Sequence, residues 1–239
     1  MIILLGPSHH VYLDGCAVTR FKYYSTPIGK IRVDTDTCKE LVESGQFTYM
    51  NSKTDEQEHS LEMHLPYIRK TMSDQGKSIP LVPILVGSIN PASEKKYGAV
   101  LRGLLSNKRN AVIISSDFCH WGSRFSHMYY EDVANKSFNL SSRRPHDVDL
   151  SVRPIHESIE AVDRRGMKLI EQGSHDRFVA YLAQTGNTIC GRHPISVVLA
   201  AMEGSEGSQN FSFIKYAQSS RIMTNLSDSS VSYASAHYL

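Results

Sequence analysis

Imidazole, carboxylate and thiol side chains follow the ends of three apolar runs in this sequence. The candidates for chemistry are His9, His10, Asp117, His120 and Cys190. Reduced copper and other soft ions accept thiolate and imidazole ligands, which suits a site with His9 and Cys190. Non-haem iron would instead need two His and one carboxylate on one face. A cysteine nucleophile with a histidine base is a third possibility, for which Cys190 and His120 are the candidates.

Further polar or aromatic residues stand beside these candidates, and each also has an ordinary structural role. Trp121, the only tryptophan, fits either the core or the wall of a pocket. Arg192 fits either an anionic ligand or an internal carboxylate. Asp117 can cap a following helix, and His193, placed at an expected helix start, can do the same. The residue types alone leave these alternatives open.

The stretch "DEQEHSLEMHLPY", residues 55–67, carries a fourth group of candidates. On a helix, His59 and Glu62 share a face, and Glu58 lies four residues before Glu62. His64 is five residues from His59 and would face elsewhere. The stretch does not match H-E-x-x-H, which disfavours a zinc protease. A pocket lined by His59 and Glu62, or a polar network that packs the helix, remains possible.

The elements that would position these residues follow from the hydrophobic pattern. Strands are predicted over seven apolar runs: Ile2–Leu5, Cys16–Thr19, Ile28–Val33, Leu81–Val86, Ala111–Ser115, Phe211–Tyr216 and Val231–Ala234. Helices are predicted over six periodic segments: Thr37–Ser44, Glu58–Met72, Pro91–Leu105, Ile155–Gln172, Ser174–Gln184 and Pro194–Met202. Their alternation favours an α/β fold with a mixed, largely parallel central sheet flanked by helices. We read Ser137–Val152 as a surface insertion.

Parallel strands place their carboxyl ends at one edge of the sheet, where ligands bind in open α/β folds. We therefore expect the three run ends to share one cleft.

Net charge is only +2 with no dominant basic block, so nucleic acid is not indicated as a partner. No apolar run is long enough to span a membrane. The four cysteines form no C-x-x-C pair, which indicates reduced thiols in the cytosol.

Five ordered stretches resemble the Memo family, mediators of ErbB2-driven cell motility. They are "GPSHHV", "DEQEHSLEMHLPY", "SSDFCHWG", "NTICGRHPI" and "YAQSS…DSSVSYA". The resemblance implies a single Memo-like domain over residues 1–239, with a fold shared with class III extradiol dioxygenases. It implies a cytoplasmic protein, with the nucleus as a second location, that relays receptor tyrosine kinase signals to the cytoskeleton. The alternative is a non-haem metal-dependent dioxygenase or a related oxidoreductase.

The resemblance also implies a site. Family members bind a redox-active copper or iron ion through two His and one Cys, and these positions include His9 and Cys190 here. The same cleft is expected to bind phosphotyrosine peptide. Its pocket residues are expected to be His10, Asp117, His120, Trp121, Arg192, His193, His59 and Glu62. No residue is assigned a catalytic role.

One departure from the family pattern concerns the other metal-binding His. In the family it lies in an "APHAGY"-like stretch after an earlier strand, and this sequence has no such stretch. We therefore expect one metal ligand, and the family's N-terminal strand and helix, to be absent, with His10 or His120 as candidate replacements for the ligand. The absent strand is expected to leave backbone groups exposed beside Ile2–Leu5.

Overall fold

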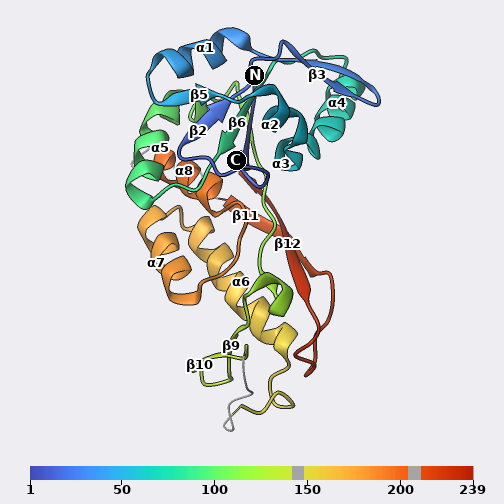
Figure 1. Ribbon diagram of the computed structural model, residues 1–239, viewed down its shortest axis with the longest axis vertical. Coiled ribbons are helices and arrows are strands. Elements are labelled where there is room, and N and C mark those ends of the chain that lie inside the picture. The colour runs from blue at the N-terminus through green and yellow to red at the C-terminus, as the bar shows by residue number, and fades with distance from the viewer. Residues whose placement is uncertain (142–147, 204–210, 239) are drawn as a thin grey trace. The chain divides into compact units, whose positions relative to one another are not determined.

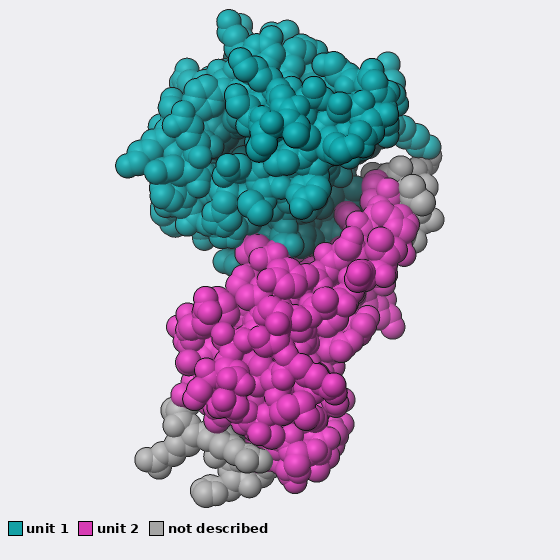
Figure 2. Space-filling model, turned by 90° about the vertical axis from the view of Figure 1, so that its right-hand side faces the viewer, with its two compact units in different colours: residues 1–116, 191–202 teal, residues 117–190, 203–239 magenta. Residues whose placement is uncertain are grey.

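The protein divides into two compact units in the computed structural model (Figure 2). Unit 1 comprises residues 1–116 and 191–202, and unit 2 comprises residues 117–190 and 203–239. The structure describes residues 1–141, 148–203 and 211–238.

A five-stranded sheet forms the centre of unit 1 (Figure 1). Its strands, in order across the sheet, are β5 (Phe47–Tyr49), β2 (Cys16–Val18), β6 (Leu81–Val86), β1 (Ile2–Pro7) and β7 (Ala111–Ile114). Only the β2–β6 pair is antiparallel; the other three pairs are parallel. Both β1 and β6 are buried at every position, as apolar strands covered on both faces should be. The predicted α/β class with a largely parallel sheet is confirmed.

Strand β1 is an interior strand of this sheet. Ile2 faces Leu81 of β6 on one side and Ala111 of β7 on the other. The expectation of exposed backbone beside Ile2–Leu5 is therefore wrong, because β7 supplies the second row of hydrogen bonds. In this sheet β7 forms the edge next to β1.

Helices and one hairpin complete unit 1. They are α1 (Thr35–Glu43), α2 (Ser52–Gln57), α3 (His59–Glu62), α4 (Leu65–Asp74), α5 (Pro91–Leu105), α8 (Arg192–Met202) and the β3 (Tyr23–Thr26)–β4 (Gly29–Arg32) hairpin. The helix predicted over Glu58–Met72 is divided into α3 and α4. Its first residue, Glu58, lies outside the helix as the N-cap of α3, because its carboxylate accepts a hydrogen bond from Ser60 N. The predicted face shared by Glu58 and Glu62 therefore does not form.

Unit 2 is built around a long antiparallel hairpin and two helices. The hairpin pairs β11 (Phe211–Gln218) with β12 (Ser230–Tyr238), and α6 (Ile155–Glu171) and α7 (His175–Thr185) accompany it (Figure 1). The smaller elements are β8 (His120–Trp121), the 3₁₀ turn η1 (Ser123–Phe125), β9 (Tyr129–Glu131) and β10 (Ser137–Asn139). No helix begins near Cys119, so the predicted capping role of Asp117 is wrong; the chain enters β8, which pairs with β12.

The segment predicted as a surface insertion, Ser137–Val152, takes part in the core of unit 2. Leu140, Val148 and Leu150 are buried in one apolar cluster with Trp121. Residues 142–147 of that segment lie outside the described residues. The apolar residues on each side of this gap therefore pack as core, although the segment as a whole is polar in composition.

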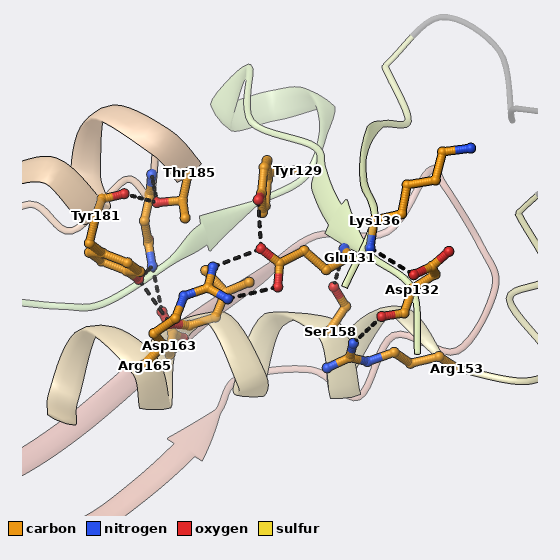
Figure 3. Close-up of polar contacts among 12 residues, drawn as sticks. Tyr129, Glu131, Asp132, Lys136, Arg153, Ser158, Asp163, Arg165, Tyr181 and Thr185 are labelled. Atoms are coloured by element: carbon orange, nitrogen blue, oxygen red, sulfur yellow. Dashed lines mark hydrogen bonds and ion pairs between the residues drawn. The ribbon is translucent and has the colours of Figure 1, made fainter. Parts of the chain in front are cut away.

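Buried polar groups tie α6 of unit 2 to its neighbours (Figure 3). The fully buried Asp163 accepts hydrogen bonds from Asn187 Nδ2 at 2.8 Å and from the Tyr216 hydroxyl at 2.9 Å. Asn187 also donates to the Tyr181 hydroxyl at 2.6 Å. These bonds fix the irregular segment that leads to Cys190.

None of the helices in the described ranges combines the length and apolar character needed to cross a bilayer.

Candidate functional site

The loop that follows β1 in unit 1 is held by a single buried carboxylate, Glu58. Its Oε2 accepts hydrogen bonds from His9 N at 2.8 Å and from His10 N at 3.2 Å. Its Oε1 accepts from Ser60 N at 3.1 Å and lies 3.3 Å from Nδ1 of the His9 ring. The Glu58 side chain has no exposed surface, whereas the His9 side chain is 33% exposed. Glu58 therefore places His9 at the end of the buried strand.

The electrostatics of Glu58 determine which ring nitrogen of His9 carries a proton. Burial raises the pKa of Glu58, but the hydrogen bonds from the His9 ring and from three backbone N–H groups outweigh it and lower the pKa to about 2. Glu58 is thus ionised at neutral pH and can only accept hydrogen bonds. His9 must then carry a proton on Nδ1, so in the neutral form of the ring the lone pair lies on Nε2.

His59 completes a group of two imidazoles and one carboxylate. Its ring stacks on the His9 ring at 4.7 Å between centroids, and its Nδ1 lies 3.8 Å from Glu58 Oε1. One ligand atom of each residue lies within 4.8 Å of the others, close enough for a candidate metal group. Glu58 is a poor ligand, however, because backbone donors and His9 already occupy its lone-pair directions. The predicted pocket residue Glu62 is exposed, and the carboxylate close to His59 is Glu58.

Unit 2 brings together three predicted site residues: Asp117, His120 and Cys190. The backbone N–H of Asp117 donates to Cys190 Sγ at 3.0 Å, and Asp117 Oδ2 lies 3.9 Å from His120 Nε2. The His120 ring Nδ1 lies 3.0 Å from the Phe118 carbonyl and 3.1 Å from the Thr188 carbonyl. Carbonyls only accept, so His120, like His9, carries its proton on Nδ1. Two of the three predicted run ends therefore meet within this unit.

The other four predicted site residues differ in their surroundings and exposure. His193 does not cap α8; its Nδ1 lies 2.7 Å from Oε1 of the buried Glu94 on α5. Trp121 lies in the core of unit 2, where its indole N–H donates to the Tyr129 carbonyl at 2.8 Å. His10 has an exposed ring and bonds to Glu58 through its backbone. Arg192 begins α8 and is half-buried.

Sequence reasoning missed Glu58 and Glu94 as partners of the predicted histidines. Glu58 had one local signal, because an acidic residue before a short helix is a candidate N-cap. Glu94 had none, since its imidazole partner lies 99 residues away. The cleft predicted to join His9 with Cys190 includes residues of both units and stays a prediction.

The fold and these groups define an α/β protein in which oriented imidazoles and a half-buried thiol follow apolar segments. The sequence model of the family described as Memo-like protein matches residues 1–237. The chain is 43% identical to Protein MEMO1 of Danio rerio and 41% identical to that of Homo sapiens, each over 98% of this chain and 73% of the relative. It is 40% identical to a MEMO1 family protein of Schizosaccharomyces pombe, over 98% of this chain and 77% of that protein. The chain belongs to the Memo family.

A solved structure supports the fold. The uncharacterized protein JW3007 from Escherichia coli K12 aligns with a TM-score of 0.53, covering 97% of this chain and 85% of that one. At 18% sequence identity, this likeness bears on the fold alone. The relatives and the fold together bear out the resemblance found in the sequence motifs.

Proposed function

We propose that this protein is a Memo-type signalling protein that binds a redox-active copper or iron ion with His9 and Cys190. The orientation of His9 carries the metal part of the proposal: a buried carboxylate holds its Nδ1–H and directs the lone pair to Nε2. Cys190 offers a half-exposed sulfur that accepts a backbone N–H, as thiolate ligands of metals commonly do. Imidazole nitrogen and thiolate sulfur form a donor set suited to both metals. When bound, the ion would supply one-electron redox chemistry.

The signalling part of the proposal rests on family membership. The chain would relay signals from a receptor tyrosine kinase to the cytoskeleton, in the cytoplasm or the nucleus, with a phosphotyrosine peptide as its partner. Its pocket would include the predicted residues that surround the two metal ligands. A binding assay with a phosphotyrosine peptide and its unphosphorylated form tests this part: selective binding of the phosphorylated peptide supports it, and equal or no binding of the two contradicts it.

Metal analysis of anaerobically purified protein tests the site. Copper or iron should be present in about stoichiometric amount in the wild type, and lost in both His9→Ala and Cys190→Ser. The matched controls are His237→Ala, at an exposed histidine on β12, and Cys38→Ala, at a cysteine on α1. Both controls should retain the metal. Stoichiometric metal that neither His9→Ala nor Cys190→Ser removes would refute the site.

A second function, ring-cleaving dioxygenase activity, is favoured by one observation. The group His9, Glu58 and His59 has the two imidazoles and one carboxylate typical of non-haem iron oxygenases. Iron binding by this group is disfavoured because Glu58 already accepts three backbone hydrogen bonds. Oxygen uptake with ferrous iron and a panel of catechols separates the two functions: turnover that is lost in Glu58→Gln would favour the dioxygenase.

A further inference from the structure

Glu58 makes a set of contacts that a structural cap alone does not require. An N-cap needs one side-chain oxygen for one or two N–H groups of its own helix, and Glu58 supplies this with Oε1 to Ser60 N. The remaining contacts reach 49 residues back along the chain, to the backbone N–H of His9 and to its ring. The same carboxylate thus fixes both the main chain and the imidazole of one residue.

His59 restricts the same ring from its face. The two imidazoles stack with an interplanar angle of 15°, so rotation of the His9 side chain would break the stack as well as the contact with Glu58. His59 itself is 62% exposed, while the Glu58 side chain is completely buried. The ring of His9 is thus held on its Nδ1 edge by an acceptor and on one face by a second ring.

We infer that Glu58 is a positioning residue that locks His9 in the Nδ1–H tautomer and presents Nε2 as its metal-binding atom. The part of this inference that names a metal rests on the proposed function. The tautomer does not, because it is a property of the metal-free protein. Carboxylate–imidazole–metal arrangements of this kind orient the ring and raise the basicity of the ligand nitrogen. Glu58 then acts through His9 and is not itself a ligand.

Nitrogen NMR of histidine-labelled, metal-free protein, at a pH alkaline enough for His9 to be a neutral imidazole, tests the tautomer directly. In the wild type, long-range ¹H–¹⁵N spectra should show His9 with a protonated Nδ1 and an unprotonated Nε2. In Glu58→Gln the amide oxygen should keep the Oε2 position, where it accepts from two backbone N–H groups, so the N–H₂ group faces the His9 ring and the Nδ1–H preference should be lost. Glu40→Gln, at an exposed glutamate on α1 that belongs to no predicted site, should leave the spectrum unchanged.

Titration with one equivalent of Cu(I), which keeps the spectrum sharp, tests the metal-binding atom. The Nε2 resonance of His9 should shift while Nδ1 remains protonated. Removing an orienting carboxylate of this kind costs about 10- to 100-fold in metal affinity, and Glu58→Gln should weaken Cu(I) binding by that factor. Glu40→Gln should bind Cu(I) as the wild type does.

The outcomes separate this inference from the proposed function. A wild-type His9 in the Nε2–H form, or a Cu(I) shift at Nδ1, overturns the role of Glu58 even if the metal binds. An Nδ1–H form in the wild type that persists in Glu58→Gln also overturns it. Failure of Cu(I) to bind, with the Nδ1–H tautomer present in the wild type and lost in Glu58→Gln, contradicts the metal proposal and leaves the positioning of His9 established. Because the wild-type spectrum is informative alone, a Glu58→Gln variant that fails to fold does not prevent the test.

Discussion

The side chain of Glu131 shows how a charge is kept inside unit 2. It is 3% exposed, and Arg165 contacts both of its oxygens, at 2.7 and 3.0 Å (Figure 3). The Tyr129 hydroxyl donates a further hydrogen bond at 2.6 Å. Burial raises the pKa of Glu131, but the bonds from Arg165 and Tyr129 outweigh it and keep the pKa below its usual value. The carboxylate is therefore stable only with its arginine in place.

Arg165→Met should destabilise the protein because it leaves the Glu131 carboxylate buried without its charged partner. Removing one member of a buried pair costs up to 3–5 kcal/mol, and we expect about 2–3 kcal/mol because Arg165 is partly exposed. The neighbouring Arg164 pairs with Glu160 at 2.6 Å on the exposed side of α6. Arg164→Met should therefore cost less than about 1 kcal/mol. Urea unfolding of the two variants tests this, and equal losses would contradict the buried-pair argument.

The stability of the protein at acid pH depends on the ionisation of Glu58. The shift of its pKa on folding determines whether acid raises or lowers that stability. Because folding lowers the pKa from 4.5 to about 2, the stabilisation is complete above pH 4.5 and is lost as the pH falls toward 2. The shift corresponds to at most about 3 kcal/mol. Glu58→Gln should be less stable at pH 7 and lose less stability between pH 5 and pH 2. Unfolding free energies measured across this range test it; parallel curves for the two proteins would show that Glu58 contributes nothing.

At the scale of elements, the packing of α5 against α8 in unit 1 depends on one small residue. A Cβ built on Gly98 of α5 would lie 2.8 Å from Ala201 N and 2.9 Å from the Val197 carbonyl oxygen, both on α8. These are backbone atoms, which cannot move aside as a side chain can. The same pair of helices carries the His193–Glu94 contact, so their spacing also positions part of the predicted site.

Gly98→Ala should push α5 away from α8 and cost about 1–3 kcal/mol, the usual penalty of overpacking. Gly103→Ala is the matched control in the same helix, because a Cβ there meets no atom within 4 Å. That change should stabilise the protein by about 0.5–1 kcal/mol, since alanine restricts the unfolded chain. Thermal melts of the two variants should therefore shift in opposite directions. A Gly98→Ala protein as stable as the wild type would show that the two helices are not in tight contact.

The long elements were predictable from sequence because periodicity and caps specify them locally. Strand Leu81–Val86 and helix Pro91–Leu105 have the predicted bounds, and α6 differs by one residue at its end. The short strands β5, β8, β9 and β10 were missed because two or three residues carry no period; their partners define them. The neighbours of β1 also depend on pairing across the chain, which the hydrophobic pattern does not contain.

At the scale of the whole molecule, the site was predictable only in part. The motifs identified His9 and Cys190 as candidate ligands, and unit 2 brings Cys190 to Asp117 and His120 as expected. The contact of His9 with Glu58, 49 residues away, forms only in the tertiary structure, and the local sequence around either residue gives little indication of it. The proposal that His9 and Cys190 bind one ion concerns the protein as a whole.

X-ray absorption spectroscopy of the copper-loaded full chain is the most direct test of that claim. We expect one first coordination shell that contains both sulfur and imidazole nitrogen. Cys190→Ser should remove the sulfur contribution, and His9→Ala should reduce the imidazole contribution in the same shell. A copper shell of nitrogen and oxygen alone, unchanged by either substitution, would contradict a site formed by His9 and Cys190.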